Sequence, residues 1–186
     1  MVIGKTYVYF AGSFKPPHAG HYSVLDRFIK MKKVHKIYII VSKKERGGIG
    51  QETSYKVWEI YLENLFKRDP ELRKKLVVVK SPDNSPLITA RRYAQSLVGK
   101  GKNNELVLVK SAKDAGNARF DLFKDLVGEG LDVKEFVIKK FKNMNSTNMR
   151  EAIQRGDKSD FMKFLPTDLT SVQKGKVWAL VKHPSS

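Results

Sequence analysis

Five short apolar runs, each separated from the next by a segment of helical periodicity, constrain the fold of this chain more than any other feature. The runs are rich in Val, Ile and Leu, and strands this apolar fit a parallel sheet that is covered on both faces. We expect strands at residues 7–10, 37–41, 76–79, 106–109 and 133–138. The segments between them predict helices over residues 21–33, 53–67, 86–98 and 118–127. This alternation predicts an α/β fold, a Rossmann-like doubly wound parallel sheet of about five strands with right-handed crossovers.

The pattern changes after residue 143. Three short helical segments follow, over residues 147–154, 158–163 and 168–182. We therefore expect a single domain over residues 1–186, with an α/β core at 1–143 and a helical C-terminal cap at 144–186. A chain of 186 residues is long enough to bury a core of this kind.

Composition excludes several classes of protein. The chain has no cysteine, so it has no disulfide framework, no thiolate zinc site and no cysteine nucleophile. No apolar stretch approaches the length of a membrane span, and we expect a cytoplasmic protein. The net charge of +17 favours anionic partners. Because no nucleic-acid-binding motif accompanies the lysines, a small nucleotide is the favoured partner and nucleic acid the alternative.

The loop after the first predicted strand has the composition of an anion-binding turn. It runs Gly12-Ser13-Phe14-Lys15-Pro16-Pro17-His18-Ala19-Gly20-His21. Glycine lets the backbone approach a ligand closely, and the two prolines restrict the loop. A helix that begins near Gly20 presents unpaired N–H groups, which bind anions. His18 and His21 flank this helix start, so both side chains can point at the same anion.

A second loop with similar chemistry follows the last predicted strand. Asn145-Ser146-Thr147-Asn148-Met149-Arg150 opens a helix, where hydroxyls and N–H groups would face an anion and the arginine adds a full charge. A capping box with Asn148 as N-cap and Glu151 at N3 explains the same residues structurally, although a capped helix can still bind phosphate. We expect the two loops to converge on one site.

These two segments resemble the signature motifs of the HxGH nucleotidyltransferase superfamily, which includes nicotinamide mononucleotide adenylyltransferases, phosphopantetheine adenylyltransferase and small cytidylyltransferases. The match is sharp only at residues 12–21 and 145–150, the second of which is similar to the (I)SSTxIR element. The resemblance implies transfer of an adenylyl group from ATP to a phosphate-bearing acceptor with release of pyrophosphate. Nicotinamide mononucleotide would be the preferred acceptor and NAD the product.

The resemblance also implies roles for the motif residues. The candidate catalytic residues are His18 and His21, which would donate hydrogen bonds to phosphate, and Arg150, which would hold the leaving pyrophosphate. Mg²⁺ would arrive with the triphosphate, and the four histidines show no metal-ligand spacing. The candidate nucleotide-binding residues of the two motifs are Gly12, Ser13, Phe14, Lys15, Gly20, Asn145, Ser146 and Thr147.

Three further groups of residues are candidates for nucleotide contacts. Lys15 stands where the superfamily usually has Asp or Asn, and it could contact phosphate or point outward. Related enzymes keep a basic residue after the second strand, which makes Lys43, Lys44 or Arg46 a candidate, with a solvated loop as the alternative. By their position after the fourth strand, Ser111 and Asp114 could line the ribose and base, or cap a helix.

Two residues are candidates for contact with the acceptor. Trp58 could stack on a planar ring, although an aromatic residue at helical spacing more commonly packs in the core. Arg91 could meet the acceptor phosphate or lie on a solvated helix face.

Other functions stay open at this point. They are a transferase that joins nicotinamide to an activated ADP-ribose, a cytidylyl- or phosphopantetheine adenylyltransferase, and a non-catalytic nucleic-acid-binding module on the same fold. Assembly into a homo-oligomer is compatible with the sequence.

Overall fold

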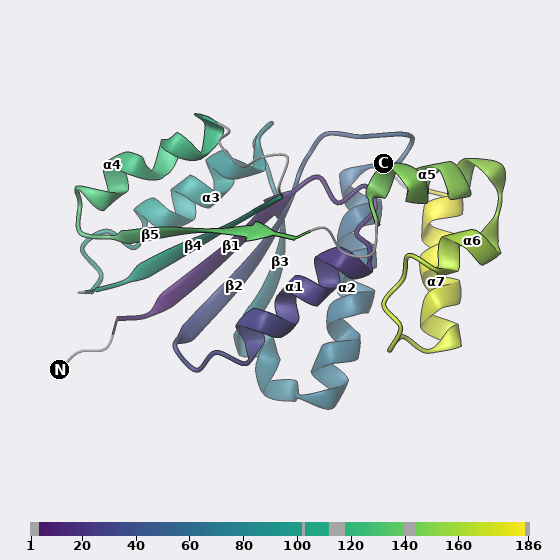
Figure 1. Cartoon of the computed structure of the whole chain (residues 1–186), viewed down its shortest axis with the longest axis horizontal. Coiled ribbons are helices and arrows are strands. Elements are labelled where there is room, and N and C mark those ends of the chain that lie inside the picture. The colour runs from purple at the N-terminus through teal and green to yellow at the C-terminus, as the bar shows by residue number, and fades with distance from the viewer. Residues whose placement is uncertain (1–3, 102, 112–117, 140–143, 185–186) are drawn as a thin grey trace.

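In the computed structural model, a five-stranded parallel sheet carries helices on both faces (Figure 1). The structure describes residues 4–101, 103–111, 118–139 and 144–184. The strands lie in the order β3-β2-β1-β4-β5, and every neighbouring pair is parallel. Their bounds are β1 Thr6–Gly12, β2 Val34–Val41, β3 Leu76–Lys80, β4 Glu105–Ser111 and β5 Asp132–Ile138. The predicted α/β, Rossmann-like sheet is therefore confirmed.

The strand order places the switch point of the sheet between β1 and β4. The chain winds outward from β1 to β2 and β3, then returns to the other side of β1 to form β4 and β5. In open sheets of this kind, ligands bind outside the carboxyl ends of the strands where the winding reverses. The loop of residues 13–18, which follows β1, begins at this point.

Alternating side chains of the central strands fill two separate cores. Val8 and Phe10 of β1 face the core formed with α1 (Ala19–Ile29), α2 (Gln51–Arg68) and the C-terminal helices. Tyr9 faces the opposite core, which is formed with α3 (Pro86–Gln95) and α4 (Lys124–Val127). The central strands β1, β2 and β4 are thus covered on both faces, which is why their sequences are almost continuously apolar, whereas the edge strand β5 has no fully buried residue.

Two predicted helices differ from those observed. The pattern over residues 118–127 is a 3₁₀ segment, η3 (Ala118–Phe123), followed by the single turn of α4. The helix expected over residues 86–98 ends as α3 at Gln95, and the chain then turns through Ser96. A further 3₁₀ segment, η1 (Pro70–Lys74), links α2 to β3.

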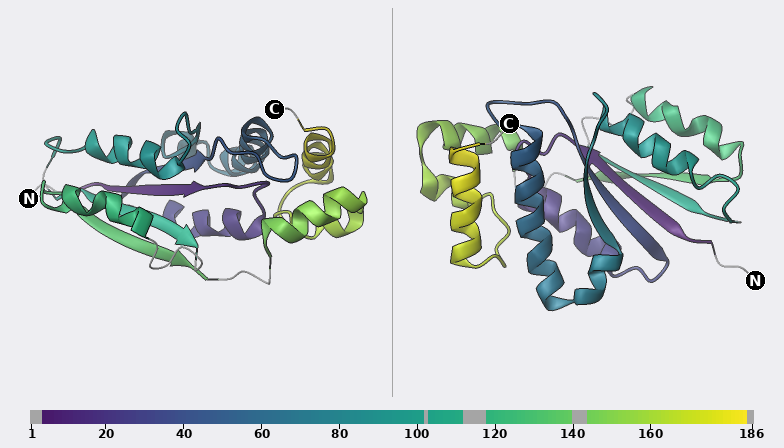
Figure 2. Two further views of the ribbon diagram at one scale, coloured as in Figure 1. Left: turned by 90° about the horizontal axis from the view of Figure 1, so that it is seen from above. Right: turned by 180° about the vertical axis from the view of Figure 1, so that it is seen from behind.

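The C-terminal segment forms three helices, the last of which packs beside α2 (Figures 1 and 2). They are α5 (Ser146–Arg155), α6 (Lys158–Met162) and α7 (Ser171–Lys182). Asp168, in the loop before α7, accepts hydrogen bonds from Tyr22 of α1 at 3.0 Å and Asn64 of α2 at 3.1 Å, and pairs with Arg68 at 2.6 Å. These bonds hold the C-terminal segment against helices α1 and α2. In the described part of the chain, no helix combines the length and apolar character needed to cross a membrane.

Candidate functional site

A cavity of about 450 Å³ lies at the carboxyl edge of the sheet. Its lining comes from the end of β1 with the loop that follows it, the start of α1, the loop after β2, the start of α3, the ends of β4 and β5, and the start of α5. Both sequence motifs contribute to the lining, so the structure brings the two loops together as expected. The predicted site residues in the lining are Gly12, Ser13, Phe14, Lys15, His21, Arg46, Ser111, Asn145, Ser146, Thr147 and Arg150.

The two histidines form a reciprocal cap at the start of α1. His18 is the N-cap residue, and its Nδ1 accepts a hydrogen bond of 3.0 Å from the backbone N–H of Gly20. Nδ1 of His21 accepts one of 3.1 Å from the N–H of His18. Because each Nδ1 is an acceptor, the neutral imidazole carries its proton on Nε2. Each ring can therefore present an N–H donor on its far side without being charged.

Burial keeps both imidazoles neutral. Burial lowers the pKa of His18 to about 4, and burial and the nearby His18 hold the pKa of His21 well below its usual value. The rings stack with centroids 3.8 Å apart. Only His21 lines the cavity, while His18 is 7% exposed and lies behind it. The sequence predicts that both rings face one anion. In this structure only His21 is in a position to do so, and His18 caps the helix and stacks on His21.

Lys15 neither points outward nor extends into solvent. Its side chain is buried, and its Nζ donates hydrogen bonds to the carbonyls of Ser13 at 2.8 Å and Ser42 at 2.9 Å. The ammonium thus joins the loop after β1 to the end of β2. Burial, and secondarily the neighbouring Arg46, lower the pKa of Lys15 to about 8. A positive charge is therefore held beneath the floor of the cavity.

The second motif docks directly on the first. Arg150 donates a hydrogen bond of 2.7 Å to the carbonyl of Lys15, and the Ser146 hydroxyl donates one of 3.0 Å to the carbonyl of Pro16. The N-cap of α5 is Asn145, whose Oδ1 accepts from the N–H of Asn148 at 2.7 Å. The alternative in which Asn148 is the N-cap is therefore wrong, because helical backbone begins at Ser146, two residues before it.

The glycine-rich loop after β2 is pinned rather than extended. Arg46 and Ile49 exchange backbone hydrogen bonds of 3.1 and 3.0 Å around Gly47 and Gly48, which have positive φ. A Cβ on Gly47 would lie 2.7 Å from Cδ of Arg150, so the loop passes against the stem of that arginine. This places Arg46 and Lys44 in the lining of the cavity, whereas Lys43 does not line it.

Four further candidates lie away from the cavity or outside the described residues. Trp58 is fully buried and packs edge-on against Phe14, so it cannot stack on an acceptor ring in this structure. Arg91 pairs with Asp125 of α4 at 2.6 Å and contacts the Leu122 carbonyl, outside the cavity lining. The N–H of Gly20 is already bonded to His18 and is not available to a ligand. Asp114 lies outside the described residues.

The lining also contains polar residues that sequence reasoning did not select. Ser42 and Lys110 end or follow β2 and β4, and Asn84 and Ser85 precede α3. The carboxyl ends of parallel strands meet at one edge, so strand position alone could have indicated Ser42 and Lys110. A polar residue directly before a proline marks a helix start and could have indicated Ser85.

The donor set of the cavity fits phosphate. Among the described lining residues there are amines, guanidinium groups, hydroxyls and an imidazole but no carboxylate. The described residues also form no cluster of three or more His, Asp or Glu that could hold a metal ion. Since protein-bound Mg²⁺ prefers carboxylate oxygens, these residues do not fit a dedicated Mg²⁺ site, and a cation would have to be carried by a bound polyphosphate.

Comparison with known proteins places the fold. No protein-family model and no curated protein sequence matches this chain. Plasmodium falciparum nicotinic acid mononucleotide adenylyltransferase complexed with APC matches with a TM-score of 0.60 and 14% identity, over 94% of this chain and 98% of that chain. A bifunctional NMN adenylyltransferase/ADP ribose pyrophosphatase from Francisella tularensis, complexed with AMP and Mn ion, matches with a TM-score of 0.58 and 15% identity, over 96% and 52%. Thermotoga maritima TmcAL bound with alpha-thio ATP matches with a TM-score of 0.54 and 10% identity, over 96% and 56%.

At these identities the likeness concerns the fold. It is the fold that the resemblance carried by residues 12–21 and 145–150 implies. The chain has the fold of the nicotinate and nicotinamide mononucleotide adenylyltransferases.

Proposed function

We propose that this protein is an adenylyltransferase that joins the AMP part of ATP to the phosphate of a pyridine mononucleotide and releases pyrophosphate. The expected acceptor is nicotinamide mononucleotide, which would give NAD. The observation that carries the proposal is the convergence of His21, Lys15, Arg46 and Arg150 on one cavity at the switch point of the sheet. The fold shared with known adenylyltransferases supports it.

The reaction requires little proton chemistry from the protein. The second pKa of a phosphate monoester is about 6, so the acceptor phosphate is largely a dianion at neutral pH and is already a nucleophile. One of its oxygens attacks the α-phosphorus of ATP, a new P–O–P bond forms, and the bond from the α-phosphorus to the β-phosphate oxygen breaks. A cavity without a carboxylate in its described lining suits this reaction, since catalysis depends on positioning and on stabilising negative charge.

The neutral His21 is the group best placed to act on the reacting phosphate. Its Nε2–H can donate to a non-bridging oxygen of the α-phosphate, where charge accumulates in the transition state. The hydrogen bond at Nδ1 fixes the tautomer and the ring orientation. His18 acts through His21, since it supplies the N–H that Nδ1 accepts and stacks on the ring.

The cations around the second motif suit the leaving pyrophosphate. Burial and, after it, the nearby charge of Arg46 lower the pKa of Arg150, and a polyphosphate would relieve the repulsion between the two guanidinium groups. Ser146 and Thr147 stand at the N-terminus of α5, where backbone N–H groups favour an anion. Mg²⁺ would enter as part of the ATP complex.

The acceptor would occupy the part of the cavity formed by the start of α3. Asn84 and Ser85 reach the cavity from α3, which packs on the opposite face of the sheet from α1 and α2. The side-chain oxygen of Ser85 makes no capping bond to its own helix. Polar groups here can bind the acceptor while the second motif holds the triphosphate.

The decisive test is pyrophosphate release from ATP and Mg²⁺ with an acceptor panel. The panel holds nicotinamide mononucleotide, nicotinic acid mononucleotide, phosphopantetheine and glycerol 3-phosphate, with CTP as alternative donor. We expect turnover with a pyridine mononucleotide and a loss of about 10²–10³ in kcat for His21→Ala. Turnover only with CTP, only with phosphopantetheine, or undiminished in His21→Ala would refute the proposal.

A further inference from the structure

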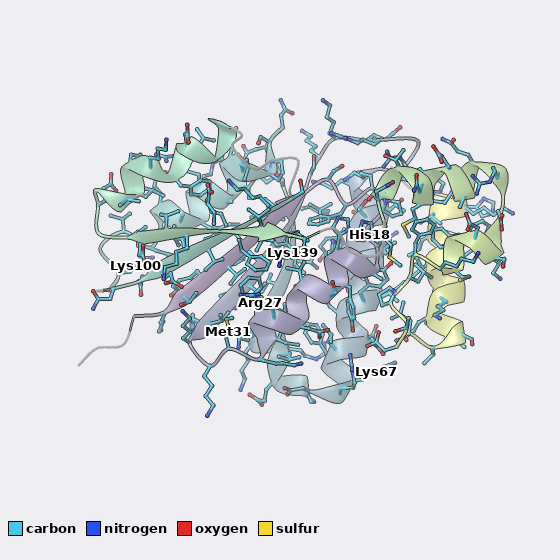
Figure 3. All side chains as sticks on the ribbon, in the orientation of Figure 1. His18, Arg27, Met31, Lys67, Lys100 and Lys139 are labelled. Carbon is cyan, nitrogen blue, oxygen red and sulfur yellow. The ribbon has the colours of Figure 1, made fainter. Side chains whose placement is uncertain are left out.

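A second cavity of about 370 Å³ lies where the strands begin, at the end of the sheet opposite the candidate active site. In Figure 3 the labels of His18 and Met31 mark the two ends of α1, and the second cavity adjoins the turn after Met31. The lining comes from the chain just before β1, the turn between α1 and β2, the start of β2, and the end of η1 with the residue that follows it. It consists of Gly4, Lys5, Lys32, Lys33, Val34, His35, Lys74 and Lys75.

The charge of this amino-end cavity is only partly neutralised. Lys33 pairs with Glu105 at 3.5 Å and Lys74 with the exposed Glu71 at 3.0 Å. Lys5 and Lys32 make no ion pair with any residue that the structure describes. No acidic residue is found in the described lining.

Two other groups show how positive this region is. The Lys75 ammonium is turned inward and donates to the carbonyls of Ile29 and Met31 at 3.1 and 3.0 Å, so its charge is fixed against the end of α1. Burial and the charges of Lys5 and Lys36 lower the pKa of His35, although its side chain is exposed. A neutral ring therefore lies among the lysines.

That ring provides an aromatic surface beside the charges. His35 packs edge-on against the half-buried ring of Tyr7 with centroids 5.5 Å apart, which fixes its orientation while one side stays exposed. Grooves that bind single-stranded nucleic acid combine such ring faces, on which bases stack, with cations along the phosphate backbone.

We infer that the amino-end cavity binds single-stranded nucleic acid, with Lys5, Lys32, Lys33 and Lys74 on successive phosphates and His35 against a base. Cations supplied by three separate segments suit a chain of phosphates better than one phosphate group. The inference does not rest on the proposed adenylyl transfer, because the two cavities share no lining residue.

The test is fluorescence anisotropy with labelled RNA and DNA strands of about 12 nucleotides in the presence of saturating ATP. Four neutralised phosphates give a slope of about −3 in log K against log salt, so affinity should fall about 50-fold between about 50 and 200 mM salt. The triple variant Lys5→Gln, Lys32→Gln, Lys74→Gln should reduce that slope to about −1 and weaken binding at least about 10-fold at low salt. Comparison of the RNA strand with the DNA strand shows whether the 2′-hydroxyl contributes to affinity.

A matched variant separates this site from general surface charge. Lys158→Gln, Lys163→Gln, Lys176→Gln removes the same charge from exposed positions in α6, α7 and the loop between them, and should change affinity less than about 2-fold. His35→Ala should weaken single strands about 5-fold and leave duplex binding unchanged, because duplex bases are already stacked. The unsubstituted protein provides a further measurement, in which bound oligonucleotide should protect Lys5, Lys32 and Lys74 from chemical acylation.

Three results would overturn the inference. They are equal losses in the two triple variants, displacement of the strand by ATP, and binding of inorganic tripolyphosphate at this cavity without binding of either strand. Pyrophosphate release by the Lys5, Lys32 and Lys74 variant should equal that of the wild type, so failure of the proposed transfer reaction would be seen separately.

Discussion

The ammonium of Lys15 and the carbonyl of Ser42 are joined by a hydrogen bond of 2.9 Å that ties the loop after β1 to the end of β2. The carbonyl of Lys15 in turn accepts from Arg150. One residue therefore connects the first motif, the second strand and the second motif. It does so with a charge that burial makes unusually easy to remove, since the pKa of Lys15 is lowered to about 8.

This arrangement predicts a pH dependence of ATP use. A neutral amine still has two N–H donors, enough for the carbonyls of Ser13 and Ser42, so deprotonation removes the charge and leaves the loop in place. In the free enzyme kcat/KM for ATP should therefore fall as pH rises through about 8. The kcat profile should stay level to higher pH, because a bound triphosphate raises the pKa of Lys15. Steady-state rates across this range test both statements.

The variant Lys15→Met identifies the titrating group. It should have a lower kcat/KM at neutral pH and no further fall near pH 8. Lys44→Met removes an exposed lysine from the same lining and should keep the fall. If the fall persists in Lys15→Met, another group is responsible.

The histidine pair predicts a loss of stability in mild acid. The pKa of His18 is about 4 in the folded protein and about 6.5 when unfolded, so the unfolded state binds protons first as pH falls. The destabilisation of the folded state by His18 is absent above about pH 6.5 and grows to about 3 kcal/mol as pH approaches 4. His21, whose pKa is also lowered, acts in the same direction. Urea unfolding at several pH values between about 7 and 5 measures the slope.

An asparagine at position 18 separates the titration from the helix cap. Asn is a good N-cap, so His18→Asn should retain the start of α1 while giving a shallower loss of stability with acid. The exposed residue His183 supplies the comparison, and His183→Gln should follow the wild type. A slope that is unchanged in His18→Asn would contradict the assignment.

Gly47 and Gly48 give a matched pair of variants in one loop. Both have positive φ, so alanine at either position should cost about 1 kcal/mol of stability. Only at Gly47 would the new Cβ meet Arg150, at 2.7 Å from Cδ, whereas nothing lies within 4 Å at Gly48. Displacement of Arg150 should lower kcat/KM for ATP about 10-fold in Gly47→Ala and leave it near normal in Gly48→Ala. Equal activity in the two variants would show that Gly47 does not position Arg150.

Much of the fold can be predicted from the sequence because its signals are local. Apolar runs mark all five strands, and the two motifs lie at strand ends, where a parallel sheet gathers its ligands. The positions that the sequence left open depend on tertiary contacts. Trp58 has the same helical spacing whether it faces a ligand or the core, and only its packing on Phe14 decides. Arg91 forms an ion pair with Asp125, which lies 34 residues later in the sequence.

The chemistry of the motif itself was also only partly predictable. The sequence predicts that a lysine in a phosphate-binding loop binds phosphate or is solvated. No local signal indicates that Lys15 will be buried, with its ammonium donating to carbonyls of two different segments. The close approach of Gly47 to Arg150 joins the loop after β2 to helix α5, which are far apart in the sequence. By contrast, the N-cap at Asn145 is a local hydrogen bond from the N–H of Asn148, although the capping box predicted from the sequence placed the cap at Asn148 itself.

Ser85 and Thr170 allow a last prediction, because both are N-cap residues but only one caps its helix. Thr170 accepts from the N–H of Gln173 and completes a capping box, whereas the side chain of Ser85 makes no capping bond and lines the cavity. Thr170→Ala should therefore cost about 1 kcal/mol of stability without changing either KM. Ser85→Ala should change stability by less than about 0.5 kcal/mol and raise the KM of the acceptor about 5-fold, with the KM of ATP unchanged. Urea unfolding and two-substrate kinetics on both variants test this contrast, and a rise in the KM of ATP instead would place the triphosphate, rather than the acceptor, at the start of α3.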